Sequence, residues 1–320
     1  MYVVKDKKFA SLNEYFDYIV ETVGFPPVHT YFKNDTIISD GLKLHVDVYE
    51  YDPMAPTLVF IPGTAMYALC YGELLFKIAQ QGYNIVALDP RGHGRSEGLR
   101  GDYTIDELVR DGQAAVTYAT QRFNSKVSVM GSSQGGIVAF YIAAKDERVN
   151  SVICQCFADL TSEDTLQLAR HPRVFKYLKL LLVKAGDALP NPQIPITSYI
   201  DLEKIPVRYF GTAKAFMDLD PLVLKTISLR ALRSLAHTEM AKPVEKINTP
   251  VFVLQGTADS IFPITYTQKI YDRLHGMKRF TKFPDRSHAL LHEDIDGVLP
   301  EITTWLKDVY HLSYQHQLGA

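Results

Sequence analysis

Residues 131–135 read Gly-Ser-Ser-Gln-Gly and fit the pattern G-x-S-x-G, with Ser133 at its centre. An apolar stretch precedes the pattern and a helix-forming stretch follows it from 137 to 144, so it lies between a predicted strand and a predicted helix. Taken alone, the pattern also fits a glycine-rich turn in other folds. In this context the glycines allow a sharp, strained turn, and the backbone N–H of Gln134 points the same way as the serine hydroxyl. We therefore predict a nucleophile at Ser133 beside half of an oxyanion hole.

Asp259 and His288 supply the groups that a nucleophilic serine needs. A serine hydroxyl reacts readily only when a base takes its proton, and an acid orients that base. The chain contains the three groups in the order Ser133, Asp259, His288. Each of them comes directly after a predicted strand. Because ligands bind at the carboxyl ends of strands in such sheets, we expect the three side chains to meet there. The set predicts acyl transfer, with His288 as the base and Asp259 as the orienting acid.

Other acids and histidines compete for these roles. Asp159 follows the preceding strand and is an alternative acid, whereas Asp285 is too close in sequence to His288 to orient it easily. His292 lies four residues after His288, a spacing that can mark a metal pair, but H-E-x-x-H and a third nearby ligand are lacking. We expect His93, in a glycine-rich loop, to be structural.

The second oxyanion donor should come from the loop after the apolar strand at 57–61. Residues 62–64 read Pro-Gly-Thr, which puts the backbone N–H of Thr64 in the expected place, with Ala65 as the alternative. We therefore expect Thr64 and Gln134 to form the oxyanion hole through their backbone N–H groups.

The surrounding pattern predicts how these residues are held. Strands alternate with helices from 57 to 159 and again from 250, which is typical of a mainly parallel sheet. A hairpin with an Asp-Gly turn is expected at 36–49, and Ser11 with Glu14 predicts the start of an N-terminal helix. We therefore divide the chain into three parts. Residues 1–35 form an N-terminal helical extension, residues 36–159 and 248–320 form the core, and residues 160–247 form a helical lid without convincing strands.

The composition is that of an ordinary globular protein. The chain has 320 residues, 47% of them hydrophobic and 22% charged, with a formal net charge of −2. This balance argues against nucleic acid as a partner, and it leaves the oligomeric state open. No stretch reaches the length of a membrane span and no targeting segment is evident, so we expect a cytoplasmic location. The three cysteines, Cys70, Cys154 and Cys156, are too few for a disulfide scaffold. Cys154 and Cys156 lie two apart on an apolar stretch, and we expect them to be small core residues rather than redox or metal groups.

A longer stretch carries a resemblance to a known family. Residues 89–98 read Asp-Pro-Arg-Gly-His-Gly-Arg-Ser-Glu-Gly and are followed by Arg-Gly at 100–101, which resembles the D-x-x-G-H-G-x-S-x-G-x-R-G stretch of the monoacylglycerol lipase/lysophospholipase group of α/β-hydrolases, classed with the serine aminopeptidases. Residues 256–259 and 287–288 are similar to the acid and histidine loops of that group. The resemblance covers about 35–310 and implies a mainly parallel central sheet flanked by helices, with an inserted helical lid. The chain departs from it with Gly-Ser-Ser-Gln-Gly where the group usually has G-H-S-M-G, and with Pro-Gly at 62–63 where His-Gly is usual.

These residues predict a serine hydrolase for carboxylic esters with an apolar acyl chain, working without a cofactor through an acyl-enzyme on Ser133. The same three groups would also serve a peptidase, an amidase or a C–C hydrolase, and a non-catalytic receptor on the same fold is the alternative of another class. We expect part of the lid to line an acyl pocket. The large apolar lid residues are Phe175, Leu178, Leu181, Leu182, Phe210, Phe216, Leu222 and Leu224.

Overall fold

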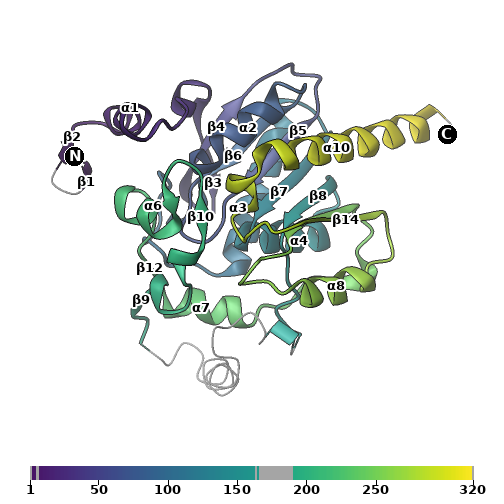
Figure 1. Ribbon diagram of the computed structural model, residues 1–320. Helices are drawn as coiled ribbons and strands as arrows, with labels where there is room; N and C mark the ends of the chain where they lie inside the picture. The colour runs from purple at the N-terminus through teal and green to yellow at the C-terminus, as the bar shows by residue number, and fades with distance from the viewer. Residues whose placement is uncertain (1, 5–6, 163, 166–189, 319–320) are drawn as a thin grey trace.

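The computed structural model describes residues 2–4, 7–162, 164–165 and 190–318 (Figure 1). An eight-stranded sheet forms the centre, in the order β14-β13-β8-β7-β5-β6-β4-β3. Strand β4 pairs antiparallel with both of its neighbours, β3 and β6. All other neighbouring strands of this sheet pair parallel, which confirms the predicted mainly parallel sheet. The strands are β3 (Lys33–Ser39), β4 (Leu42–Tyr49), β5 (Thr57–Ile61), β6 (Asn84–Leu88), β7 (Val127–Ser132), β8 (Val149–Gln155), β13 (Val251–Gly256) and β14 (Lys278–Phe283).

The hairpin at the edge of the sheet follows from its turn residues. Asp40 and Gly41 have φ angles of 48° and 80° and join β3 to β4, with Ser39 paired to Leu42. A two-residue turn with both central residues at positive φ matches the twist of the flanking strands. The predicted Asp-Gly turn is therefore confirmed.

Helices cover both faces of the sheet (Figure 1). The helices α2 (Gly72–Ala79) and α10 (Ile295–Leu318) contact each other on one face, and α3 (Ile105–Arg122) contacts α4 (Gln134–Lys145) on the other. All residues of β5, β6 and β7 are buried, as expected for strands covered on both sides. The remaining core helices are α8 (Ile264–Arg273) and α9 (Leu290–Glu293), and short 3₁₀ turns occupy Val28–Thr30, Ala68–Tyr71, Ile196–Ser198, Leu202–Lys204 and Val244–Lys246.

The inserted segment contains short strands that the sequence did not predict. In its described part, β9 (Gln193–Pro195) pairs with β12 (Thr226–Ser228), and β10 (Pro206–Val207) pairs with β11 (Gly211–Thr212). The prediction of no strand between 160 and 247 was therefore wrong, because ladders of two or three residues are too short to show an alternating pattern. The helices of the described part of the insertion are α6 (Ala213–Leu219) and α7 (Leu229–Ala236), and α7 follows β12 directly.

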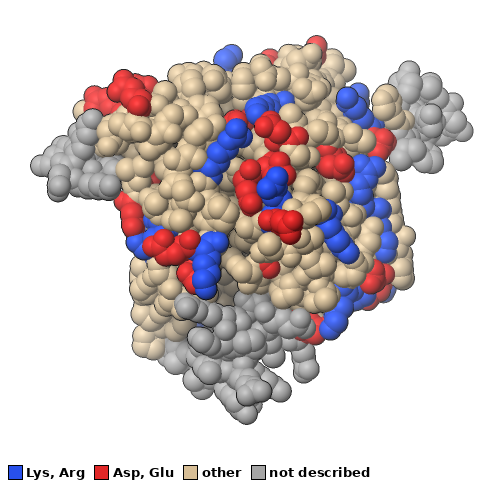
Figure 2. All heavy atoms as spheres, viewed as in Figure 1, with Lys and Arg blue, Asp and Glu red and all other residues tan. Residues whose placement is uncertain are grey.

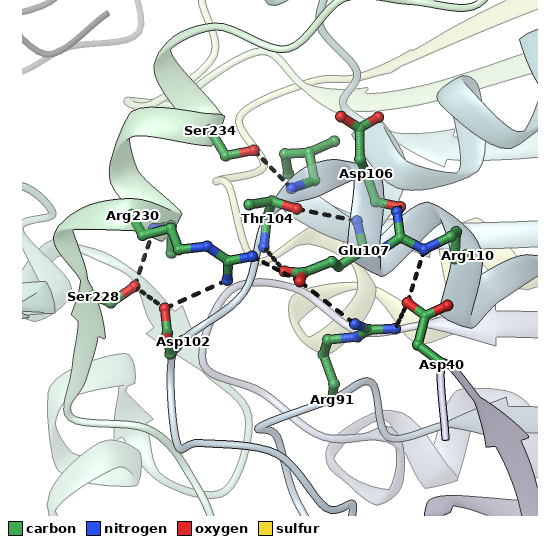
Figure 3. A network of polar contacts seen from close by, with 12 residues as sticks. Asp40, Arg91, Asp102, Thr104, Asp106, Glu107, Arg110, Ser228, Arg230 and Ser234 are labelled. Atoms are coloured by element: carbon green, nitrogen blue, oxygen red, sulfur yellow. Dashed lines mark hydrogen bonds and ion pairs between the residues drawn. The ribbon is translucent and has the colours of Figure 1, made fainter. Parts of the chain in front are cut away.

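Polar contacts dock α7 onto the start of α3 (Figure 3). The backbone N–H of Ile105 donates to Ser234 Oγ at 2.7 Å, and Arg230 donates to Glu107 Oε1 at 2.6 Å. Glu107 also lies 3.6 Å from the guanidinium of Arg91 in the core. Glu107 also completes the capping box at the N-terminus of α3. The insertion therefore contacts the core at the capped end of this helix.

The N-terminal extension packs against the insertion. It contains β1 (Tyr2–Val4), β2 (Lys7–Phe9) and α1 (Leu12–Val23), and Ser11 caps the helix by accepting from the N–H of Glu14. The buried hydroxyl of Tyr15 on α1 donates to Asp220 Oδ2 at 2.7 Å, and the ring of Phe25 meets that of Phe210. The extension therefore holds a part of the insertion from outside the core.

On the face shown in Figure 2, acidic and basic side chains are interspersed, in keeping with the small net charge. Among the described residues, every helix is too short or too polar to cross a bilayer.

Candidate active site

The serine at the end of β7 lies on a sharp turn. Ser133 has φ 52° and ψ −116°, a combination that is costly for a residue with a side chain and that persists only where the surroundings hold it. Its N–H donates to Gln155 O at 2.8 Å. A Cβ on Gly131 would lie 1.9 Å from Gly135 O, and one on Gly135 would lie 2.2 Å from Ile61 O, so only glycine fits at either place.

Three polar side chains meet at this turn. Ser133 Oγ lies 2.9 Å from His288 Nε2, and His288 Nδ1 lies 2.8 Å from Asp259 Oδ2. The carboxylate can only accept, so Nδ1 carries the proton and Nε2 accepts from the serine hydroxyl. The ring of Phe262 stacks on the imidazole with centroids 5.6 Å apart and planes 3° from parallel, which fixes the orientation of the ring.

Asp259 is held as a buried carboxylate. Its Oδ1 accepts from the backbone N–H groups of Ile261 at 2.8 Å and Phe262 at 2.9 Å. Burial acts to raise the pKa of Asp259, but His288 and these two N–H groups outweigh it and bring the pKa below its ordinary value. The carboxylate therefore keeps its charge beside His288.

Two backbone N–H groups lie on segments next to the serine, since a Cβ on Gly63 would be 3.5 Å from Ser133 Cβ and Gln134 follows Ser133 in the chain. Among the described residues, the backbone N–H groups of Thr64 and Gln134 donate to no protein acceptor. Thr64 follows β5 and Gln134 begins α4, next to Ser133. The Thr64 hydroxyl donates to Gln134 Oε1 at 3.1 Å, and the hydroxyl of Tyr103 donates to the same oxygen at 3.0 Å. The arrangement can place two donors on an oxyanion.

The insertion borders the loop that carries Thr64. The N–H of Leu224 donates to Ala65 O at 3.0 Å, and Ala65 has φ 71°. Two residues further, Tyr67 donates to Asp220 Oδ2 at 2.7 Å, the oxygen that also accepts from Tyr15. Burial raises the pKa of Asp220, although the hydroxyl and backbone donors partly offset it.

Of the large apolar residues of the lid, only some of which we expect to line an acyl pocket, Phe210 and Phe216 border a small cavity together with Tyr71 and Leu291 of the core. Leu222 and Leu224 are buried. The other four lie outside the described residues; these are Phe175, Leu178, Leu181 and Leu182.

The competing acids are engaged elsewhere. Asp159 forms an ion pair with Arg273 at 2.9 Å, and Asp285 is an exposed residue whose backbone N–H donates to Thr257 Oγ1 at 2.9 Å. Neither carboxylate takes part in a described contact with His288. Asp259 is thus the acid that the structure brings to this histidine.

His93 is buried, His292 is half-buried, and neither takes part in a described contact with Ser133. Burial lowers the pKa of His93 to about 4, and its Nδ1 lies 2.9 Å from Arg91 O. Burial also lowers the pKa of His292 to about 4, and its ring lies 4.4 Å from that of Tyr71. Both are therefore neutral near pH 7 and belong to the packing around the site.

The residues at 89–98 support the loop that carries Thr64. Buried Asp89 accepts from the N–H of Ala68 at 2.8 Å through Oδ1 and from the N–H of Arg95 at 3.0 Å through Oδ2. Arg95 also forms an ion pair with Asp47 on β4. This stretch thus ties the loop after β5 to the neighbouring strands.

Sequence reasoning missed the role of the residues after β8. Cys156 is buried, as predicted, but its Sγ lies 3.2 Å from Asp259 Oδ2. Cys156, Asp259 and His288 bring three atoms able to bind a metal within 4.8 Å of one another. These three side chains form a series of hydrogen bonds, from Cys156 to Asp259 to His288, that ends at Ser133. Such a series is suited to proton transfer. An apolar strand with a cysteine at its end gave no signal for this contact.

Comparison with known proteins supplies a family. A family model described as "Serine aminopeptidase, S33" matches residues 52–295. A thiohydrolase, aneE, from Aspergillus aculeatus is 24% identical over 299 residues, covering 88% of this chain and 94% of the relative. The monoacylglycerol lipase of Mycolicibacterium smegmatis is 26% identical over 282 residues, covering 85% and 95%.

A solved structure agrees in fold. The crystal structure of Paleococcus ferrophilus monoacylglycerol lipase superposes with a TM-score of 0.66 at 22% identity and covers 83% of this chain and 99% of that one. Other matching relatives carry the names of haloperoxidases and of an esterase/perhydrolase. The superposition supports the fold, whereas the names of the relatives differ in the reaction.

Proposed function

Since this chain belongs to the serine aminopeptidase (S33) family of α/β-hydrolases, we propose that it is a serine hydrolase that cleaves carboxylic esters through an acyl-enzyme on Ser133. The observation that carries the proposal is the hydrogen-bonded series from Ser133 Oγ through His288 to Asp259, at 2.9 and 2.8 Å. A serine activated in this way attacks carbonyl carbon.

In the proposed reaction, Ser133 Oγ attacks the ester carbonyl while His288 Nε2 takes the hydroxyl proton. Asp259 keeps the proton on Nδ1 and stabilises the cation that forms. The N–H groups of Thr64 and Gln134 donate to the oxyanion, and one such donor is typically worth about 2.7–4 kcal/mol. His288 then returns the proton to the leaving alkoxide.

The acyl-enzyme is hydrolysed by the same groups in reverse roles. His288 takes a proton from water, the hydroxide attacks the acyl carbonyl, and the tetrahedral intermediate collapses to release the acid and restore the Ser133 hydroxyl. Every proton in this scheme moves between Ser133, His288, water and the substrate.

We propose an apolar acyl group for the substrate, with the insertion at 160–247 acting as the lid. Phe210 and Phe216 border a small cavity, of about 20 Å³, beside Tyr71. Ser133 and His288 do not line it, but the Tyr71 hydroxyl connects it to the Thr64 loop by accepting from the N–H of Gly63. Ligand sites are mostly apolar with few polar groups. The monoacylglycerol lipase among the relatives supports an acyl ester, and the thiohydrolase supports testing a thioester of the same acyl group.

The test is a panel of substrates with one acyl group and different leaving groups. It comprises p-nitrophenyl esters and monoacylglycerols of graded chain length, the matching thioesters, and p-nitroanilides, each with Ser133→Ala as control. We expect ester turnover that Ser133→Ala abolishes. Turnover of the anilides alone would favour a peptidase or amidase, and a protein that turns over none of them and resists a fluorophosphonate probe would be a receptor.

A further inference from the structure

The end of β8 touches all three residues of the proposed triad. Gln155 O accepts from the N–H of Ser133 at 2.8 Å, and Gln155 Nε2 donates to the backbone carbonyl of His288 at 3.0 Å. The next residue, Cys156, donates from Sγ to Asp259 Oδ2 at 3.2 Å. Two consecutive residues therefore bridge three loops that are far apart in the sequence.

The contacts of Gln155 leave its amide one orientation. The carbonyl of His288 can only accept, so the amide nitrogen must face it. The amide oxygen then faces Ser132, whose hydroxyl donates to it at 2.7 Å. Because Gln155 is only 1% exposed, both ends of its amide are fixed inside the protein.

Cys156 adopts a backbone conformation that aims its side chain at the acid. Its φ of 65° lies in the left-handed region, which is uncommon for a residue with a side chain. A Cβ on Gly136 would lie 2.2 Å from Cys156 O, so α4 packs directly on this peptide. The surroundings thus hold a strained residue next to Asp259.

The thiol of Cys156 is a donor. Burial raises its pKa well above the ordinary value, and the nearby charge of Asp259 raises it further. Oδ2 of Asp259 therefore accepts from two groups, Cys156 Sγ and His288 Nδ1, while Oδ1 accepts from two backbone N–H groups. Gln155 Nε2 also lies 3.1 Å from Cys156 Sγ, so the thiol accepts from the amide while it donates to the carboxylate.

We propose that Gln155 and Cys156 are positioning residues for the triad: Cys156 holds Asp259 by sharing Oδ2 with His288, and Gln155 holds the backbone of His288. The inference rests on the proposed function. When Cys156 is replaced by alanine, His288 becomes the sole donor to Oδ2. The carboxylate then binds protonated His288 more strongly and is itself held less firmly, so kcat falls and the acid side of the kcat/KM profile moves to higher pH.

The experiment compares Cys156→Ala with Cys156→Ser, which keeps a donor. For Cys156→Ala we expect kcat to fall by about 3- to 10-fold, the effect of losing one hydrogen bond from a weak thiol donor, with KM unchanged. We also expect the midpoint on the acid side of the profile of kcat/KM against pH to move to higher pH. Cys156→Ser should restore both kcat and this midpoint to their wild-type values. Cys154→Ala is the control, since Cys154 is an equally buried thiol on β8 and should leave the midpoint in place.

Gln155→Met provides a second variant of similar size without the amide. We expect it to lower kcat and to slow inactivation by a fluorophosphonate probe, because the backbone of His288 is no longer held. If Cys156→Ala folds and keeps the wild-type kcat and midpoint, or if Cys156→Ser fails to restore them, the inference is wrong while the proposed function stands. If wild-type protein neither hydrolyses esters nor reacts with the probe, both fall together.

Discussion

The hydroxyl of Thr64 donates to the side-chain carbonyl of Gln134 at 3.1 Å, so the two residues proposed for the oxyanion hole are joined directly although 70 residues separate them. Tyr103 donates to the same carbonyl, and within the described part of the chain the backbone N–H groups of Thr64 and Gln134 have no protein acceptor. In the oxyanion hole that we propose, the two donor residues are therefore held by a contact with each other.

Gly135→Ala should disrupt this arrangement. The new Cβ would lie 2.2 Å from Ile61 O and 2.5 Å from Pro62 O, forcing the elbow and the Thr64 loop apart. We expect a loss of about 1–3 kcal/mol in the free energy of unfolding and a large fall in kcat. Urea unfolding and steady-state kinetics measure the two. Gly276→Ala is the control, because its nearest neighbour would be 3.3 Å away; equal losses in both variants would contradict the account.

Asp259→Asn should reduce stability in a pH-dependent way. The pKa of Asp259 is lower in the folded protein than its ordinary value, so the unfolded chain binds a proton first as pH falls. The stability that this carboxylate contributes is fully present above about pH 4, near the ordinary aspartate pKa, and is lost as pH falls through the folded value. We expect the difference in unfolding free energy between wild type and Asp259→Asn to be about 1.5–3 kcal/mol at pH 6 and to shrink below pH 4. A difference that grows in acid would reverse the assigned direction.

Tyr67→Phe and Tyr15→Phe should each weaken the contact between the insertion and its neighbours. Both hydroxyls donate to Asp220 Oδ2 at 2.7 Å inside the protein. We expect each change to cost about 1–3 kcal/mol of unfolding free energy, and the double variant to be non-additive because the two share one acceptor. Tyr51→Phe, at a residue 56% exposed, serves as the control and should cost less than about 0.5 kcal/mol. Strict additivity would show that the two hydroxyls act independently.

The lid proposal predicts a chain-length profile. Each further CH₂ buried by the substrate contributes about 0.8 kcal/mol, so kcat/KM should rise with acyl length and then stop at the limit of the pocket. Phe210→Trp narrows the cavity that Phe210 borders and should move the break to shorter chains. Phe123→Trp, at the end of α3, is the matched control and should leave the break in place. A flat profile, or a break that Phe210→Trp does not move, would leave the insertion as packing alone.

The sheet could be predicted from the sequence because its signals are local. Apolar runs alternate with helical stretches, and turn residues such as Asp40 and Gly41 mark the boundaries. The same strand ends located Ser133, Asp259 and His288 at one edge of the sheet, where the structure brings them into contact.

The features that the sequence did not predict depend on contacts between segments that are far apart in the chain. The ladder of β9 and β12 pairs residues about 30 apart over three positions, too few for a periodic pattern. The role of Cys156 depends on a positive φ and on a partner 103 residues away, and neither leaves a mark on the strand that precedes it. The choice between Asp159 and Asp259 likewise needed the structure, in which Asp259 contacts His288 and Asp159 pairs with Arg273.

Site-mapped labelling by a fluorophosphonate tests the central claim, that Ser133 is the nucleophile, most directly. Wild type, Ser133→Ala and Ser132→Ala are treated with the probe, the adduct is located by peptide mass spectrometry, and kcat for a p-nitrophenyl ester is measured in parallel. Because Ser132 Oγ donates to Gln155 rather than to His288, Ser132→Ala should remain labelled and active. We predict a single adduct on Ser133 and a fall in kcat of about 10⁴- to 10⁶-fold in Ser133→Ala. An adduct on another residue, with ester hydrolysis retained in Ser133→Ala, would contradict the account.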